Sequence, residues 1–82
     1  MMFHSIKFFV GQTVNIDEIM ADLLAFQYER AHHVRQEGEF CRRGEVLDLF
    51  PVSFDNPIRI SFDFDAVVSI ESLNMASGHP IG

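Results

Sequence analysis

Eighty-two residues leave room for one domain with one small hydrophobic core. Hydrophobic residues make up 48% of the chain and charged residues 22%, a globular composition that excludes a disordered or fibrous protein. A membrane span needs an apolar run of about 18 residues, and the sequence has none. The net charge of −6 argues against direct nucleic-acid binding. A single cysteine, Cys41, excludes an internal disulfide and fits a reducing, cytoplasmic setting.

The sequence predicts one helix near its start. Residues 3–10 alternate as in a first strand, and a turn follows at residues 11–13. Asn15 has the character of a helix N-cap, with Glu18 three residues later in the manner of a capping box. The apolar residues that follow recur at helical spacing, so we expect an amphipathic helix over residues 16–26.

After the helix the period of the pattern drops to two, which predicts four strands over residues 28–35, 39–50, 58–64 and 67–73. Gly44 falls inside the second of these and indicates a bulge. Along residues 58–64 the alternation predicts that the apolar side chains of Ile58, Ile60, Phe62 and Phe64 share one face.

This element order, β-α-β-β-β-β with short connections after the helix, predicts a two-layer α+β fold. One amphipathic helix packs on a curved, mainly antiparallel sheet, and the other face of the sheet is partly exposed and available for binding. We expect one domain over residues 1–74 and a loose tail or linker stub over residues 75–82.

All five arginines fall in one window of the chain, at Arg30, Arg35, Arg42, Arg43 and Arg59. One interpretation is a set of solvated strand faces with local ion pairs, in which Arg59 pairs with Asp63 on its own strand. The other interpretation is a docking patch for a protein partner, because the planar guanidinium pairs with carboxylates through two hydrogen bonds.

A metal site is not expected. The candidate ligands are Cys41 and the histidines His4, His32, His33 and His79. There is no cysteine pair, and adjacent residues of a strand such as His32 and His33 point to opposite faces. We expect no metal and no other cofactor.

Catalysis is the weakest of the functional hypotheses. Cys41 is a conceivable nucleophile, and Asp63 and Asp65, with Asp48, could bring carboxylates together. A lone cysteine in a strand is usually an inert buried residue, and Asp65 has the character of a hairpin-turn residue. No glycine-rich phosphate loop is present, so we expect no enzyme activity.

Residues 38–51 read GEFCRRGEVLDLFP. This segment resembles the pattern G-E-F-x-x-R-G-x-(aliphatic)-(aliphatic)-D-(aliphatic)-F-P of the UvrB-interaction domain of the bacterial transcription-repair coupling factor, whose counterpart is the UvrA-binding domain of UvrB. Residues 57–60 are similar to the family's P-x-R-(aliphatic), residues 62–70 to its F-F-x-D-E-I-x-S-I, and residues 26–30 to its (aliphatic)-G-Y-x-R. Together the likeness covers residues 11–73. The departures are Gln27 in place of glycine, Cys41, Glu45, the exchanged order of Asp63 and Phe64, and Ala66.

The resemblance implies a docking module that recruits UvrA, the damage-sensing ATPase of nucleotide excision repair. It implies partner contacts for Arg43 and Phe50 in the motif, for Arg59 in the later strand and for Arg30 in the tyrosine motif; Arg42 joins them as the neighbour of Arg43. Phe50 could equally be a core residue. The motors of both parent families lie outside this chain. The alternative is a structural or self-associating domain without UvrA binding, although a monomer is favoured over a homodimer.

Overall fold

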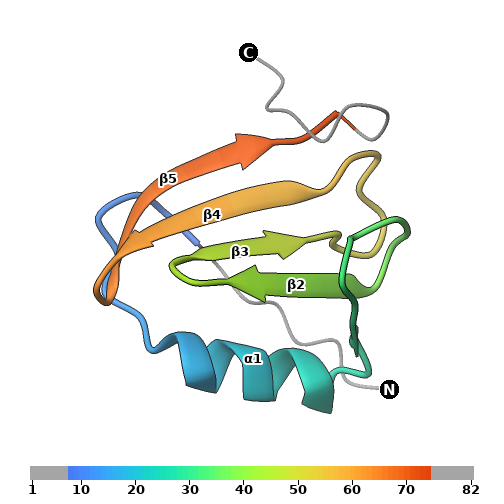
Figure 1. Ribbon diagram of the computed structural model, residues 1–82, viewed down its shortest axis with the longest axis horizontal. Coiled ribbons are helices and arrows are strands. Elements are labelled where there is room, and N and C mark those ends of the chain that lie inside the picture. The colour runs from blue at the N-terminus through green and yellow to red at the C-terminus, as the bar shows by residue number, and fades with distance from the viewer. Residues whose placement is uncertain (1–7, 75–82) are drawn as a thin grey trace.

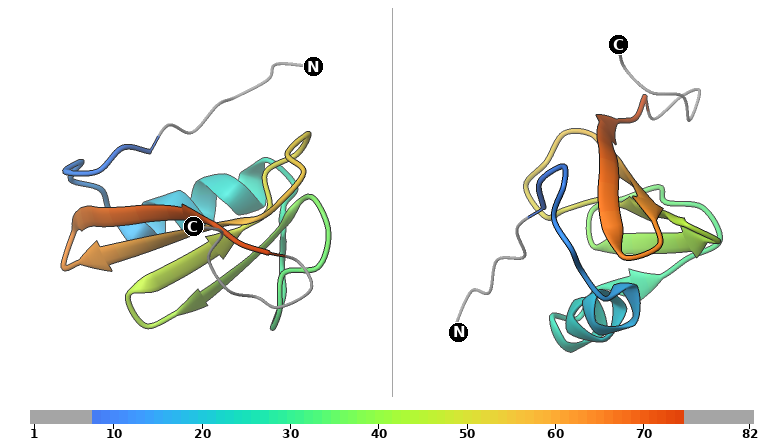
Figure 2. Two further views of the ribbon diagram at one scale, coloured as in Figure 1. Left: turned by 90° about the horizontal axis from the view of Figure 1, so that it is seen from above. Right: turned by 90° about the vertical axis from the view of Figure 1, so that its left-hand side faces the viewer.

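The computed structural model describes residues 8–74. They form one helix and five strands, α1 (Ile16–Ala25), β1 (Glu29–Arg30), β2 (Glu39–Arg43), β3 (Val46–Leu49), β4 (Ile58–Asp63) and β5 (Ala66–Ser72). The strands make one sheet in the order β1-β2-β3-β4-β5, and Figures 1 and 2 show α1 lying against this twisted sheet. The predicted two-layer α+β fold is confirmed.

Two expectations concern the ends of the chain. Most of the predicted first strand, and the predicted tail over residues 75–82, lie outside the described residues. The described end of that strand, residues 8–10, leads into a turn at Val10 and Gly11 instead of forming a strand. The backbone then runs beside β5, where Thr13 forms an isolated antiparallel bridge with Ala66.

The start of α1 follows from its N-cap. The Asn15 side chain accepts a hydrogen bond from the backbone N–H of Glu18 at 3.1 Å, which satisfies one of the free amides of the first turn. Asp17 and Glu18 place carboxylates in that turn, where the helix dipole favours them. The predicted helix is confirmed, and it ends one residue earlier than expected because Phe26 is its C-cap.

The end of α1 is a Schellman motif. Gln27 donates to the carbonyl of Leu24 at 3.0 Å and Tyr28 donates to the carbonyl of Leu23 at 2.9 Å. The motif needs a left-handed residue directly after the cap, and Gln27 takes φ +69° there. Glycine is the usual residue at this position because it lacks the Cβ that the left-handed region crowds.

The expected strand over residues 39–50 is wrong in one respect, because it is two strands joined by a tight hairpin. β2 pairs antiparallel with β3, with Arg43 opposite Val46 and a two-residue loop of Gly44 and Glu45 between them. Gly44 takes φ +59° at the first central position of the loop, where a type II′ turn requires glycine. The glycine that alternation alone assigns to a bulge therefore reverses the chain.

The expected strand over residues 28–35 is also largely wrong. Only Glu29 and Arg30 form a strand, and this β1 pairs parallel with β2. The chain then crosses to β2 through a short loop, residues 31–38, which we call the crossover loop. The Glu39 carboxylate holds this loop by accepting hydrogen bonds from the N–H groups of Arg35 and Gln36, at 2.8 and 3.0 Å. Hydrogen bonds to the Glu39 side chain thus take the place of the backbone hydrogen bonds that a longer strand would form with its neighbour.

Phe64 departs from the face predicted for it. β4 ends at Asp63, and Phe64 and Asp65 form the turn into β5. Phe64 takes φ +55° in this turn, and 82% of its surface is exposed. The register of β4 with β5 shifts between the pairs Ser61–Ser69 and Phe62–Val67, which leaves Val68 as an extra residue on β5, while Phe62 stays buried in the core.

The core lies between α1 and one face of the sheet. The helix contributes Ile16, Ile19 and Leu23, and the sheet contributes Phe40, Leu47, Leu49, Ile60, Phe62 and Val67. Since α1 covers this face, the odd-numbered positions of β2 and β4 point to the opposite face, which we call the open face.

Candidate protein-docking surface

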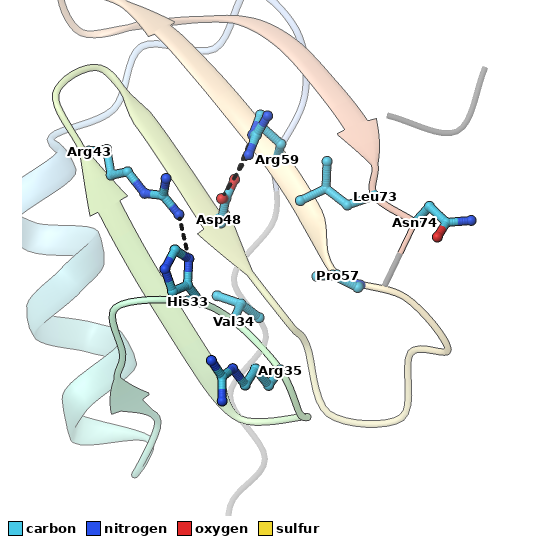
Figure 3. Close-up of a pocket in the computed structure, with 9 residues that line it drawn as sticks. All are labelled: His33, Val34, Arg35, Arg43, Asp48, Pro57, Arg59, Leu73 and Asn74. Atoms are coloured by element: carbon cyan, nitrogen blue, oxygen red, sulfur yellow. Dashed lines mark hydrogen bonds and ion pairs between the residues drawn. The ribbon is translucent and has the colours of Figure 1, made fainter. Parts of the chain in front are cut away.

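A row of polar side chains crosses the centre of the open face. The strand registers place Cys41 of β2 opposite Asp48 of β3, Asp48 opposite Arg59 of β4, and Arg59 opposite Glu71 of β5. Arg43 lies two residues further along β2 on the same face. Figure 3 shows Arg43, Asp48 and Arg59 on three neighbouring strands, with His33, Val34 and Arg35 of the crossover loop beside them.

Asp48 and Arg59 form the strongest polar contact of this face. Arg59 donates from Nε to Asp48 Oδ1 at 2.8 Å and from Nη2 to Oδ2 at 3.1 Å. Asp48 is only 6% exposed, so its charge depends on this bidentate partner. The hydrogen bonds that Arg59 donates to the Asp48 carboxylate raise the pKa of Arg59 above its ordinary value, and desolvation opposes this rise.

The expected pairing of Arg59 with Asp63 is therefore wrong. The partner is the cross-strand neighbour Asp48, whereas Asp63 ends β4 in an exposed position. A carboxylate directly opposite on an adjacent strand is closer than one four residues along the same strand. The positive charge of Arg59 is therefore paired within the domain, with the carboxylate of Asp48.

Arg43 is exposed and has no carboxylate partner among residues 8–74. Its Nη2 lies 3.3 Å from His33 Nδ1 and 3.5 Å from the carbonyl oxygen of His32. Both contacts are to neutral acceptors of the crossover loop, so they orient the guanidinium without neutralising its charge.

Two hollows flank Arg43. The first has a volume of about 340 Å³ and lies between the crossover loop and the strands, lined by His33, Val34, Arg35, Arg43, Asp48, Pro57, Arg59, Leu73 and Asn74. The second, about 520 Å³, lies at the edge of the sheet and is lined by Arg30, Ala31, His32, Cys41, Arg42 and Arg43. Among residues 8–74, Arg43 alone lines both hollows.

Arg42 belongs to the other side of β2. Its Nη1 lies 3.1 Å from Asp17 Oδ1 at the start of α1, and its Nε donates to the carbonyl of Gly44 at 3.0 Å. Adjacent strand residues point to opposite faces, so Arg42 and Arg43 cannot reach the same flat partner surface from the centre of the strand.

Phe50, a residue for which the sequence left two interpretations open, lies in the interior. Only 6% of its surface is exposed, and its backbone extends the pairing of β2 with β3 by bonding to Gly38 and Glu39. It therefore offers a partner little apolar area. Arg30 lies on β1 and lines the second hollow, and no hydrogen bond from its side chain to another described residue is found.

The candidate catalytic residues Cys41, Asp63 and Asp65 do not lie together in one site. Cys41 is buried and its Sγ donates to the carbonyl of His32 at 3.2 Å, whereas Asp63 and Asp65 are exposed at the far end of β4. Within residues 8–74, no group of three or more metal-ligating side chains comes together. His4 and His79 lie outside the described residues.

Two residues of the first hollow, His33 and Arg35, were not predicted as partner-binding residues: the sequence offered His33 only as a candidate metal ligand and Arg35 only as a member of the arginine window. Both belong to the segment that was expected to be a strand. A signal was nevertheless present, because alternation over residues 28–35 already places these two side chains on one face.

Comparison with known proteins identifies the family of this chain. The UvrB interaction domain family matches residues 6–82. The chain belongs to this family. In this UvrB interaction domain, the motif over residues 38–51 contains β2, the Gly44 turn and β3, and Arg43 is the last residue of β2.

Relatives of two kinds share the domain. The chain is 40% identical over 73 residues to UvrABC system protein B of Caldicellulosiruptor bescii, covering 88% of this chain and 11% of that protein. It is 32% identical over 71 residues to UvrABC system protein B of Treponema denticola, covering 87% and 11%. It is 37% identical over 65 residues to the transcription-repair-coupling factor of Bacillus subtilis, covering 79% and 6%.

The chain thus spans about a tenth, or less, of the length of the curated relatives that it matches. It corresponds to the interaction domain that UvrB and the transcription-repair coupling factor have in common. In the part of the chain that the structure describes, no helix is long and apolar enough to cross a membrane.

Proposed function

We propose that this UvrB interaction domain docks a UvrA-like protein through the open face, with Arg43 at the centre of the contact. The observation that carries the proposal is the state of Arg43, an exposed guanidinium held by two neutral acceptors and flanked by two hollows. A partner carboxylate that reaches it gains a charge-assisted hydrogen bond without breaking an ion pair.

The other arginines have different roles in this proposal. Arg35 and Arg30 line the two hollows on either side of Arg43 and extend its positive surface. Arg59 acts mainly as a positioning residue, because Asp48 already occupies two of its donors. Arg42 lines the second hollow with Arg30, but Asp17 on the helix side pairs with it, so it lies at the margin of the docking surface with its charge already matched.

The shape of the surface agrees with a protein partner. The hollows are shallow, arginine-rich and bounded by the crossover loop, and arginine is over-represented at the energetic centres of protein interfaces. A partner needs no deep pocket, since bidentate arginine contacts give geometric specificity on a nearly flat sheet.

The test compares charge reversal at two adjacent arginines. Arg43→Glu and Arg42→Glu change the net charge equally, but they act on opposite faces of β2. We expect Arg43→Glu to weaken binding to purified UvrA by about 2 kcal/mol or more, measured by titration calorimetry, because a carboxylate then faces the partner's acidic group. Arg42→Glu should have a much smaller effect.

Circular dichroism and thermal unfolding of both variants check that the fold is intact. Equal losses for the two variants would show a general charge effect and reject the site. Unchanged affinity of a folded Arg43→Glu variant would reject Arg43 as its centre, and absence of binding by the unmodified domain would reject UvrA as the partner.

A further inference from the structure

The contact between Arg43 and His33 has a consequence for docking, and the following inference rests on the proposed function. A guanidinium can only donate hydrogen bonds, so His33 Nδ1, 3.3 Å from Arg43 Nη2, must accept with its lone pair. A proton on Nδ1 would remove the acceptor and place two cations against each other.

The charged groups around His33 come from three strands and the crossover loop itself. Arg43 of β2 and Arg35 of the loop bring positive charge, and neither has a carboxylate partner in the described structure. Asp48 of β3 is the acidic residue that lines this hollow, and Arg59 of β4 holds both of its oxygens. Two further carboxylates belong to this face: Glu39 of β2 accepts hydrogen bonds from the N–H groups of Arg35 and Gln36, and Glu71 of β5 lies opposite Arg59.

Among residues 8–74, no carboxylate is hydrogen-bonded to His33 or paired with Arg43. A carboxylate that docks at Arg43 would supply an anion there, and it would compete with Nδ1 for the Arg43 donor. The freed nitrogen can then accept a proton from solvent and donate it in a hydrogen bond to the same carboxylate. The hydrogen bond from Arg43 to His33 is thereby replaced by two charge-assisted hydrogen bonds to the incoming carboxylate, one from Arg43 and one from His33.

We infer that His33 takes up a proton when an acidic side chain of the partner docks at Arg43, so that docking tightens as the pH falls. The effect of docking on His33 protonation and the effect of protonation on docking are one thermodynamic coupling. A partner that favours the protonated imidazole must bind more tightly to the protonated domain. His33 thus adjusts the affinity of the arginine surface across the range in which histidine titrates.

The test uses His33→Asn, because the asparagine side-chain oxygen keeps an acceptor near the position of Nδ1 and cannot be protonated. Binding of the full chain to UvrA is measured by calorimetry at about pH 6 and about pH 8. For the unmodified domain we expect affinity about threefold to tenfold higher at the lower pH. For His33→Asn the ratio of the affinities at the two pH values should fall close to one.

His32→Asn is the matched control, since His32 is the neighbouring imidazole and lines the other hollow. It should keep the full pH dependence. Repeating the titrations in buffers of different ionisation enthalpy counts the protons directly, and the unmodified domain should take up more protons per complex than His33→Asn. Binding with the same proton uptake in both proteins would overturn the inference while leaving the proposed function intact.

If UvrA does not bind, the proposed function fails and a second measurement still decides the inference. A glutamate hexapeptide is titrated into the isotope-labelled domain, and the His33 ring is followed by NMR. We expect the ring to stay protonated to a higher pH in the presence of peptide, and Arg43→Gln to abolish this effect. A ring titration that the peptide leaves unchanged would overturn the inference.

Discussion

Arg59 of β4 donates two hydrogen bonds to Asp48 of β3, its direct cross-strand neighbour, at the centre of the open face. The two residues differ in exposure, because the Arg59 side chain is 30% exposed and that of Asp48 only 9%. Loss of the arginine would therefore leave a buried charge without a partner, whereas loss of the aspartate would leave an arginine that can turn to water.

We predict an asymmetric effect of the two single substitutions. Arg59→Met should lower the free energy of unfolding by about 2–3 kcal/mol, and Asp48→Asn should lower it by about 1 kcal/mol. Urea unfolding of both single variants and of the double variant measures the coupling, and the double variant should be more stable than the sum of the two losses implies. A strictly additive double variant would contradict the pairing.

The same pair should add no pH dependence through its arginine. The raised pKa of Arg59 means that its stabilising contribution is complete below the ordinary range of arginine and is lost only as the pH rises through that range. Between about pH 6 and about pH 9 the arginine stays charged in both folded and unfolded chains. Any change in docking over this interval must come from other groups.

The second prediction concerns the end of α1. Gln27→Gly should raise the free energy of unfolding by about 1 kcal/mol, because Gln27 holds φ +69° at the position where the Schellman motif favours glycine. The gain is reduced by the greater freedom of glycine in the unfolded chain. Thermal unfolding measures it, and Gln27→Ala, which keeps a Cβ, is the control that should bring no comparable gain.

A third prediction concerns the thiol of Cys41. Its Sγ is buried and donates to the carbonyl of His32, so a thiol reagent should label the native domain slowly. The labelling rate should rise with urea in step with unfolding as followed by circular dichroism. Rapid labelling of the native domain would show that the crossover loop opens and that Cys41 is accessible beneath it.

The sequence predicted the elements whose signals are local. The N-cap at Asn15 and the helical spacing after it both concern residues within one or two turns, and they fixed α1 to within one residue. The motif over residues 38–51 likewise indicated the family and the strand from which Arg43 projects. These signals need no knowledge of what lies opposite in space.

The errors arose where the partner of a residue is distant in the chain. Alternation continues through Gly44 and through Phe64, so it could not show that one reverses the chain and the other leaves the core. Arg59 has an acid four residues away in sequence, and only the register of β3 with β4 reveals Asp48 as its partner. The crossover loop was missed because its bends depend on Glu39 side-chain bonds.

One feature of the sheet bears on how far its two edges are open to pairing with another chain. β5 is an edge strand, and the segment over residues 11–14 bonds to its first half, through Gly11 to Val67, Val67 to Gln12 and Val14 to Asp65. At the opposite edge β1 has only two residues, too short a template for another chain. Shortening the protein to the start of α1 would therefore leave the N–H of Val67 and the carbonyls of Val67 and Asp65 without these partners, at an edge where another strand could pair.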